Sequence, residues 1–428
     1  MKIAMITAGG AGMFCGSCMQ DNTLARALRD VGHEVTLVPT YTPIKVDEEN
    51  VSVDRVFLGG INVYLDSVVP GWSRLPRFLK SWLDRPHILR LLIRSGSSTD
   101  AARLGPLTVD MLRGVHGPQR DEIHQLMTWL VEDLKPDLIL FSNALLSGIV
   151  PALRQRFHGR IVCLLQGDDI FLDALPDRWR QTSIDLVRDN SQHFDRLITH
   201  SRWYVRHLAD SIGLDPDRFL QIPLSIDCEQ PGTADEKFND SGPKTIGYFA
   251  RICPEKGVDN FLNAAQQIAT SDDSLQFRIA GYLPELHRRW FQTRLEEVQH
   301  VVGSDRLQWL GSPQTREDKF RLLSSYDLLC VPADYREPKA IFMLEAALAG
   351  VPSLVPDHGA FPERIRELGR GWTYPATSAT ALAPAIQHAV GQLDSETSKH
   401  LCRTVRQKFA ATVTGPVISQ VLEQIAAS

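Results

Sequence analysis

Short apolar runs, each bounded by glycine, proline or polar residues, recur along both halves of the chain. Runs of this kind are typical of buried strands. They occupy residues 3–7, 34–39, 136–142, 160–165 and 196–201 in the first half, and residues 245–250, 277–281, 307–312 and 326–332 in the second. Segments with helical spacing lie between them, at residues 22–31, 147–157, from 203 onwards, and at 260–268. This alternation predicts an α/β protein whose parallel sheets are wrapped by helices.

A change in composition between the two halves marks a domain boundary. Residues 228–243 are rich in proline, glycine, serine, threonine and acidic side chains, which is the composition of a linker. We therefore expect a first Rossmann-like domain over residues 1–230, a linker over 231–243 and a second Rossmann-like domain over 244–405. Residues 406–428 close the chain with a helix, predicted over 412–426.

Length and composition exclude several classes of protein. At 428 residues the chain is long enough for two domains, each with its own core. The hydrophobic content of 43% and charged content of 23% are those of an ordinary soluble protein, and the net charge of −5 gives no electrostatic reason to expect nucleic acid. No apolar run approaches the roughly 20 residues of a membrane span, and the first residues read as a core strand rather than a signal peptide. These features predict a cytoplasmic protein.

Cys15 and Cys18 have the spacing of a redox or metal-binding pair. The seven cysteines form an odd, scattered set, as expected in a reducing cytoplasm. The pair follows a strand and opens a helix, where a thiol can be activated. No second pair completes a tetrahedral zinc site. We favour the interpretation that these are small residues closing a ligand loop, with the redox or metal role as the alternative.

Residues 72–94 mix aromatic, leucine and cationic side chains at helical spacing. A basic amphipathic helix of this kind can lie on an anionic membrane surface. More commonly, such a helix turns one face to the core and the other to water. We favour the second interpretation, and a peripheral membrane contact through residues 72–94 is the alternative.

A glycine-rich loop at residues 9–16 follows the first strand and contains Gly10 and Gly12. Such a loop can bind a dinucleotide, but that function requires an acidic residue at the end of the second strand. The second strand ends in Val-Pro-Thr-Tyr at residues 38–41 instead. This argues against a dehydrogenase, and we expect Gly10 and Gly12 to let the backbone approach another ligand closely.

The stretch 335–350 organises the second half of the chain. A buried strand at 326–332 precedes it, Pro338 suits the first turn of a helix, and Gly350 suits its end. The pattern predicts Glu337 in the strand-to-helix loop and Glu345 about two turns inside the helix. Carboxylates so placed can hold two hydroxyl-rich parts of one ligand, with a phosphate at the helix amides between them. The alternative is that Glu337 caps the helix and Glu345 is exposed to solvent.

Arg251 and Lys256 lie in another strand-to-helix loop, at residues 251–259. Two cations at the start of a helix are suited to the negative charge that develops on a nucleoside diphosphate leaving group. With such a pair no metal need bridge the phosphates, so we expect neither a metal nor a cofactor. The sequence Asp-Pro-Asp at 215–217 has the order of a metal-binding motif but reads as an ordinary turn. The alternative for Arg251 and Lys256 is two surface cations beside a turn.

The order of these motifs resembles a known family. The cationic loop 251–257, the stretch 335–350 and the segment 359–363 together resemble the nucleotide-sugar site of the family 4 retaining glycosyltransferases, which have the GT-B fold. The resemblance covers almost the whole chain and is specific mainly in the second half. It implies two Rossmann-like domains whose parallel sheets face each other across a cleft. It also implies that the last helix crosses back to the first domain.

The resemblance implies catalytic roles for Arg251, Lys256 and Glu337, the first two at the diphosphate and the third at the hydroxyls of the transferred sugar. It implies binding roles for a second set, each with its own ligand: Glu345 for the ribose hydroxyls, the amides of Lys339, Ala340 and Ile341 for a phosphate, and Gln166 for the donor or the acceptor.

Three departures from the family pattern bear on the shape of the pocket. Lys339 and Ala340 stand where the family commonly has phenylalanine and glycine, and Ala360 replaces a usual glycine. Gln166 replaces a usual histidine, and a glutamine can form hydrogen bonds to a hydroxyl but cannot take up a proton.

The predicted function is therefore that of a retaining glycosyltransferase. It would move a sugar from a nucleotide-diphospho-sugar to a hydroxyl of a glycan, a lipid-linked acceptor or a small molecule, without a metal. Two alternatives stay open: a nucleotide-sugar isomerase or hydrolase on the same fold, and a non-catalytic protein that binds nucleotide-sugars.

Overall fold

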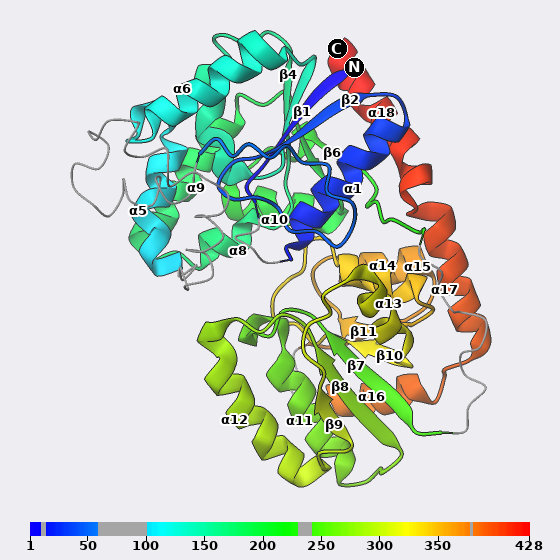
Figure 1. The fold of residues 1–428 in the computed structure, drawn as a ribbon. Coiled ribbons are helices and arrows are strands. Elements are labelled where there is room, and N and C mark those ends of the chain that lie inside the picture. The colour runs from blue at the N-terminus through cyan, green and yellow to red at the C-terminus, as the bar shows by residue number, and fades with distance from the viewer. Residues whose placement is uncertain (10–13, 59–100, 230–241, 377–379) are drawn as a thin grey trace. The chain divides into compact units, whose positions relative to one another are not determined.

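The structure is a computed structural model, and it describes residues 1–9, 14–58, 101–229, 242–376 and 380–428. The chain forms two compact units (Figure 1): unit 1 comprises Met1–Ser225 and Thr414–Ser428, and unit 2 comprises Ile226–Val413. Gly10, Gly12 and the segment 72–94 lie outside the described residues, so their predicted roles stay predictions. Within the described residues, no helix combines the length and the apolar character needed to cross a membrane.

Unit 1 is built on a six-stranded sheet of parallel strands in the order β2-β1-β3-β4-β5-β6. The strands are β1 (Lys2–Thr7), β2 (Glu34–Pro39), β3 (Leu138–Phe141), β4 (Arg160–Leu164), β5 (Arg196–Thr199) and β6 (Phe219–Gln221). The described helices are α1 (Gly16–Asp30), α5 (Ala101–Leu112), η2 (Gly114–His116), α6 (Arg120–Thr128), η3 (Trp129–Leu134), η4 (Ala144–Ile149), α7 (Val150–Leu153), α8 (Asp168–Asp173), α9 (Asp177–Ser191), α10 (Arg202–Ile212), η5 (Pro216–Arg218) and α18 (Ala411–Ala427).

Helices cover both faces of the unit 1 sheet, which explains why its strands carry apolar side chains on both faces. In β1, Ile3 and Met5 belong to one core, while Ala4 and Ile6 belong to the other, because successive side chains of a strand point to opposite faces. Helices α1 and α18 complete the first core, and helices α5, α6, α9 and α10 complete the second.

The last helix of the chain, α18, belongs to unit 1 from Thr414 onward and lies beside α1 (Figure 1). Ile418, Leu422 and Ile425 recur at helical spacing and are buried in the same core as α1. The hydroxyls of Thr414 and Ser225 are 2.6 Å apart, so the helix is also fixed by a buried hydrogen bond. The first and last segments of the sequence therefore share one core.

Unit 2 has a second six-stranded parallel sheet, in the order β12-β11-β10-β7-β8-β9. The strands are β7 (Lys244–Phe249), β8 (Leu275–Ala280), β9 (Leu307–Trp309), β10 (Leu328–Cys330), β11 (Ser353–Pro356) and β12 (Trp372–Tyr374). The described helices are η7 (Pro254–Lys256), α11 (Val258–Ala269), α12 (Glu285–Val302), α13 (Arg316–Ser324), α14 (Ile341–Leu348), α15 (Phe361–Leu368), α16 (Leu382–Val390) and α17 (Ser395–Lys408). The predicted α/β architecture with two Rossmann-like parallel sheets is confirmed.

Helix α1 begins earlier than its predicted start at residue 22. The carbonyl of Cys15 accepts a hydrogen bond from the amide of Met19 at 2.9 Å, and the helix starts at Gly16. The glycine and serine after Cys15 resemble a loop in the sequence, but they form the first turn of the helix.

The predicted helix over residues 147–157 is also wrong in its bounds and type. The segment forms the 3₁₀ helix η4 and then the short helix α7. The side chain of Asn143 accepts a hydrogen bond from the amide of Leu145, so the turn starts before residue 147. Gly148 lies so close to the carbonyl oxygen of Met111 that an added Cβ would be 2.2 Å from it, and a glycine is needed at that contact.

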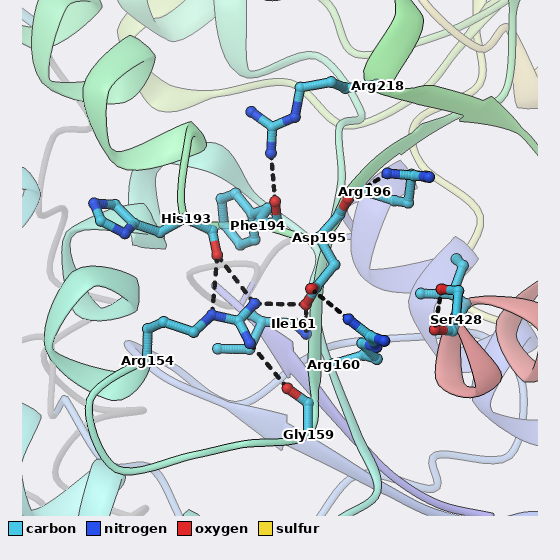
Figure 2. A network of polar contacts seen from close by, with 11 residues as sticks. Arg154, Gly159, Arg160, Ile161, His193, Phe194, Asp195, Arg196, Arg218 and Ser428 are labelled. Carbon is cyan, nitrogen blue, oxygen red and sulfur yellow. Dashed lines mark hydrogen bonds and ion pairs between the residues drawn. The ribbon is translucent and has the colours of Figure 1, made fainter.

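Asp195 joins the amino-terminal ends of β4 and β5 (Figure 2). Its carboxylate accepts hydrogen bonds from Arg154 at 2.5 Å, from Arg160 at 3.2 Å and from the backbone amide of Ile161 at 2.7 Å. Burial alone would raise the pKa of the Asp195 carboxyl, but the Ile161 amide and the Arg154 guanidinium outweigh burial, and the pKa is lowered. The ionised form is therefore the one that the fold stabilises.

We predict that Asp195→Asn lowers the free energy of unfolding by about 2 kcal/mol near neutral pH, because hydrogen bonds to a charged group contribute about 1.5–3 kcal/mol. Since the pKa of Asp195 is lowered in the folded chain, its contribution is full above the unfolded pKa of about 3.9 and is lost as the pH falls through the folded pKa. Urea unfolding should therefore show a difference between wild type and variant that shrinks below about pH 4.

The matched control is Asp173→Asn, because Asp173 pairs with Arg180 at 2.8 Å on the surface, with about half of its side chain exposed. Its effect should stay within about 0.5 kcal/mol. Equal effects of the two substitutions would contradict the role assigned to Asp195.

Candidate functional site

Three loops of unit 2 follow strands β7, β10 and β11, which are neighbours in the sheet. Because the strands are parallel, their carboxyl ends meet at one edge, where open α/β sheets bind ligands. The loop after β7 carries Arg251 and Lys256, and the loop after β10 carries Glu337. The sheet order therefore brings together residues that are far apart in the sequence.

The loop after β7 is held by a buried tyrosine and a glycine. The hydroxyl of Tyr248 donates to the carbonyls of Arg251 at 3.3 Å and of Lys256 at 3.1 Å. Gly257 adopts a positive φ of 71°, and an added Cβ would be 1.7 Å from the carbonyl oxygen of Pro332. Only glycine fits there, and the loops after β7 and β10 consequently pack directly on each other.

Lys256 and Glu337 are in contact. The Nζ atom of Lys256 is 2.5 Å from Oε2 of Glu337, and the two side chains are 18% and 11% exposed. Lys256 also lies over the ring of Tyr335, at 4.5 Å from the ring centroid. The backbone of this second loop is fixed as well, because the amide of Tyr335 donates to the carbonyl of Glu255 at 3.1 Å.

The loop after β11 fixes the backbone of Glu337 from the other side. The amide of Ala360 donates to the Glu337 carbonyl at 2.8 Å. Gly359 has a φ of 63°, and an added Cβ would be 2.8 Å from the amide nitrogen of Glu337. Ala360 itself has a φ of −82°, which any residue adopts, so the replacement of the family's usual glycine causes no backbone strain at this position.

The start of α14 differs from the prediction. The helix begins at Ile341, so Pro338 lies before it rather than in its first turn, and Glu345 is about one turn inside the helix rather than two. The cap residue, Ala340, has φ 59° and ψ 48°, a left-handed conformation that glycine adopts without strain. The alanine therefore takes the backbone conformation that the family's usual glycine would favour, and the helix starts only after it.

Glu345 forms an ion pair that the sequence analysis missed. Oε1 of Glu345 is 2.5 Å from Nζ of Lys319, and the side chains are 9% and 6% exposed. A signal for Lys319 was present in the sequence, because Arg316, Lys319, Phe320 and Leu323 recur at helical spacing and are all buried. A lysine on the inward face of a helix requires a partner, and the partner is Glu345.

The remaining predicted residues of unit 2 lie at the same sheet edge. Arg251 pairs with Glu255 at 2.8 Å, and its side chain is 46% exposed. Lys339, which lies between Glu337 and α14 in the sequence, is buried. Ile341 is the first residue of α14. The structure thus pairs Lys256 with Glu337, whereas Arg251 has its own partner on the same loop.

Gln166 belongs to unit 1, where it follows β4. Its Nε2 atom donates to Oδ1 of Asp21 at 2.8 Å, and Oδ2 of Asp21 accepts from the hydroxyl of Thr7 at 2.7 Å. Thr7 ends β1 and Gln166 follows β4, so this buried network lies at the carboxyl edge of the unit 1 sheet. Asp21 is a second residue that the sequence analysis did not single out.

The other candidate motifs have structural explanations. Hydrogen bonding with Cys15, followed by burial, raises the pKa of the Cys18 thiol, which is the opposite of what an activated redox thiol requires. Asp215 accepts a hydrogen bond from the amide of Asp217 at 3.0 Å, as the turn interpretation predicts. In the described part of the chain, no group of three or more histidine, cysteine or acidic residues is arranged to hold a metal ion.

Comparison with known proteins identifies the domain that carries this site. Residues 232–403 match the family model described as "Glycosyl transferases group 1". This part of the chain is therefore similar to the group 1 glycosyltransferases. The resemblance drawn from the sequence is therefore confirmed at the level of this family.

Similar sequences bear glycosyltransferase names. WcaL of Escherichia coli, named as a colanic acid biosynthesis glycosyltransferase, is 25% identical over 219 residues, which are 50% of this chain and 49% of that protein. Its counterpart of the same name in Salmonella typhimurium is 24% identical over 279 residues, covering 63% of this chain and 64% of that protein. The matched regions thus span about half to two thirds of these relatives.

Solved structures match the fold over its whole length. Sucrose-phosphate synthase from Thermosynechococcus elongatus has a TM-score of 0.69 at 17% identity, covering 100% of both chains. HepE from Anabaena, solved in complex with UDP and glucose, has a TM-score of 0.64 at 16% identity, covering 99% of this chain and 100% of that chain. These similarities confirm the predicted glycosyltransferase fold.

We predict that Ala340→Gly raises the free energy of unfolding by up to about 1 kcal/mol. A left-handed conformation costs a residue with a side chain about 1–2 kcal/mol, which glycine avoids. The greater flexibility of glycine in the unfolded chain offsets part of this gain. Chemical denaturation measures the change. The matched control, Ala346→Gly, lies in the interior of α14 and should instead destabilise by about 1 kcal/mol or more. A destabilised Ala340→Gly variant would contradict the backbone conformation described here.

Proposed function

We propose that the protein is a retaining glycosyltransferase, which transfers a sugar from a nucleotide-diphospho-sugar to an acceptor hydroxyl. The observation that carries the proposal is the contact between Lys256 and Glu337 at 2.5 Å, at the carboxyl edge of the unit 2 sheet. It is supported by the family match over residues 232–403, which spans both residues.

In this proposal the donor diphosphate lies between Lys256, Arg251 and the start of α14. The first turn of a helix leaves backbone amides without partners inside the helix, and these amides bind phosphate oxygens. As the bond between the sugar and the diphosphate breaks, negative charge grows on the leaving group, and Lys256 and Arg251 offset it. These cations and amides supply the positive charge for which a metal ion would otherwise be needed.

The two carboxylates are proposed to bind hydroxyl groups. Glu337 accepts hydrogen bonds from the transferred sugar, and Glu345 accepts them from the ribose of the nucleotide. When the diphosphate attracts Lys256, one carboxylate oxygen of Glu337 becomes available to the sugar. Binding of the donor therefore replaces the Lys256–Glu337 contact with two contacts to one ligand.

The proposed reaction is a substitution on one face of the sugar. The bond between the anomeric carbon and the diphosphate oxygen breaks, and the acceptor oxygen forms its bond to the same carbon on the same face. The hydroxyl proton passes to a phosphate oxygen of the leaving group, so the products are a glycoside and a nucleoside diphosphate. The protein contributes orientation and charge stabilisation rather than a nucleophile.

Gln166 is proposed to contact the donor or the acceptor in unit 1. Because its amide donates to Asp21, its orientation is fixed. A glutamine cannot take up the proton of the acceptor hydroxyl, which agrees with transfer of that proton to the donor phosphate. The proposed acceptors are a glycan, a lipid-linked sugar or a small molecule.

We predict that Lys256→Ala and Glu337→Gln each reduce sugar transfer by at least about 100-fold, the usual loss when one group that stabilises the transition-state charge is removed. Release of nucleoside diphosphate from a donor such as UDP-glucose, measured with an acceptor panel, tests this, and thermal unfolding confirms that the variants fold. The control is Lys244→Ala, since Lys244 pairs with Asp327 at 3.5 Å in the same unit, at the opposite end of β7. Full activity in both site variants would contradict the proposal.

The same assay separates the two alternative functions. Turnover of the donor at an equal rate without any acceptor would favour a hydrolase or an isomerase. Tight donor binding with no turnover across the acceptor panel would favour a non-catalytic binding protein.

A further inference from the structure

Lys319 and Glu345 form a buried ion pair between α13 and α14. The distance between Nζ and Oε1 is 2.5 Å, and each side chain is less than one tenth exposed. Glu345 is the one charged residue of α14, and Met343, Leu344, Ala346, Ala347 and Leu348 around it are buried and apolar. The pair is thus set in an apolar part of unit 2.

Stability alone does not account for such a pair. The free energy lost when two charges are removed from water is about as large as the free energy gained from their attraction. Apolar side chains of the same size therefore often stabilise a core equally well or better. Glu345 lies about one turn after the start of α14, beside the proposed phosphate position. A carboxylate in this position can bind a ligand, and a buried cation beside it offsets the cost of burying its charge.

The pair also restricts how Glu345 can act. Lys319 occupies one oxygen, Oε1, and thereby fixes the rotation of the carboxylate. A carboxylate has about four lone-pair sites on its two oxygens, so the lysine leaves acceptor capacity for hydroxyl groups. Both side chains are anchored on helices, and an acceptor fixed in this way can distinguish one arrangement of hydroxyls from another.

From these observations we propose that Lys319 is a positioning residue that makes the nucleotide site selective for ribose. It holds the Glu345 carboxylate so that its remaining lone pairs accept hydrogen bonds from the 2′- and 3′-hydroxyls of a ribonucleoside diphosphate. This inference rests on the proposed function, because it requires that Glu345 faces the ribose of a bound nucleotide.

The contrast with Lys256 supports different roles for the two lysines. The Lys256 and Glu337 side chains are 18% and 11% exposed, against 6% and 9% for Lys319 and Glu345. The more exposed pair can open when a ligand brings its own charges. The less exposed pair stays closed, since an opened pair would leave a charge unpaired in an apolar environment. Lys319 therefore orients Glu345 and does not itself contact the phosphates.

The test compares binding of UDP and 2′-deoxy-UDP by titration calorimetry, with GDP and 2′-deoxy-GDP as a second pair of probes. Wild type should bind the ribonucleotide at least about tenfold more tightly than its deoxy counterpart. The reason is that a buried acceptor left without a hydrogen bond lowers the affinity by about tenfold or more. In Lys319→Met this ratio should fall below about threefold, because affinity for the ribonucleotide is lost and affinity for the deoxynucleotide is nearly unchanged.

Two further variants keep the result decisive. Lys244→Met removes a lysine from a different ion pair of unit 2 and should retain the wild-type ratio. If Lys319→Met does not fold, Lys319→Gln replaces it, because glutamine keeps most of the side-chain length and a neutral hydrogen-bond donor. Its ratio of ribonucleotide to deoxynucleotide affinity should lie between about threefold and the wild-type value, because a neutral donor forms a weaker hydrogen bond than an ammonium. The ratio of the two affinities is the readout, because a merely structural role of Lys319 would weaken the binding of both nucleotides equally.

The possible outcomes separate this inference from the proposed function. A folded Lys319 variant with the wild-type ratio overturns the role of Lys319 while the nucleotide site stands. A wild-type protein that binds both nucleotides equally also overturns it. A wild-type protein that binds no nucleoside diphosphate of any base overturns the proposed function, and the inference falls with it.

Discussion

Lys256 and Glu337 are 81 positions apart in the sequence, and their contact depends on the order of strands in the unit 2 sheet. Strands β7 and β10 are neighbours, so the loops that follow them emerge side by side at one edge. Gly257 permits the two loops to touch, because no side chain fits between it and Pro332. The site therefore requires a parallel sheet with this strand order, and a change in the order would separate its charged groups.

Each of the two carboxylates that we propose to bind ligand hydroxyls is paired with a lysine, but the pairs differ in burial. The Lys256–Glu337 pair is partly exposed and can exchange its contacts for those of a ligand. The Lys319–Glu345 pair is buried between two helices, and we propose that it is a fixed acceptor. In this proposal, one part of the site responds to the donor and the other part selects it.

Much of this arrangement could be predicted from the sequence. The apolar runs located β1 to β5 and β7 to β10 but not the short strands β6, β11 and β12. The motifs at 251–257 and 335–350 indicated the family and two strand-to-helix loops. The start of α14 could not be read in the same way, because Pro338 suits a first helical turn and only the backbone shows that Ala340 is left-handed. Lys319 and Asp21 were missed because both lie outside the predicted helices, and their polar partners come from other segments of the chain.

The most direct measurement is a crystal structure of the protein with a bound nucleoside diphosphate. We expect the diphosphate within hydrogen-bond distance of the Lys256 ammonium and of the amides at the start of α14, the Lys256–Glu337 contact opened, and the ribose beside Glu345. A nucleotide bound at another place, with the Lys256–Glu337 contact intact, would contradict the account.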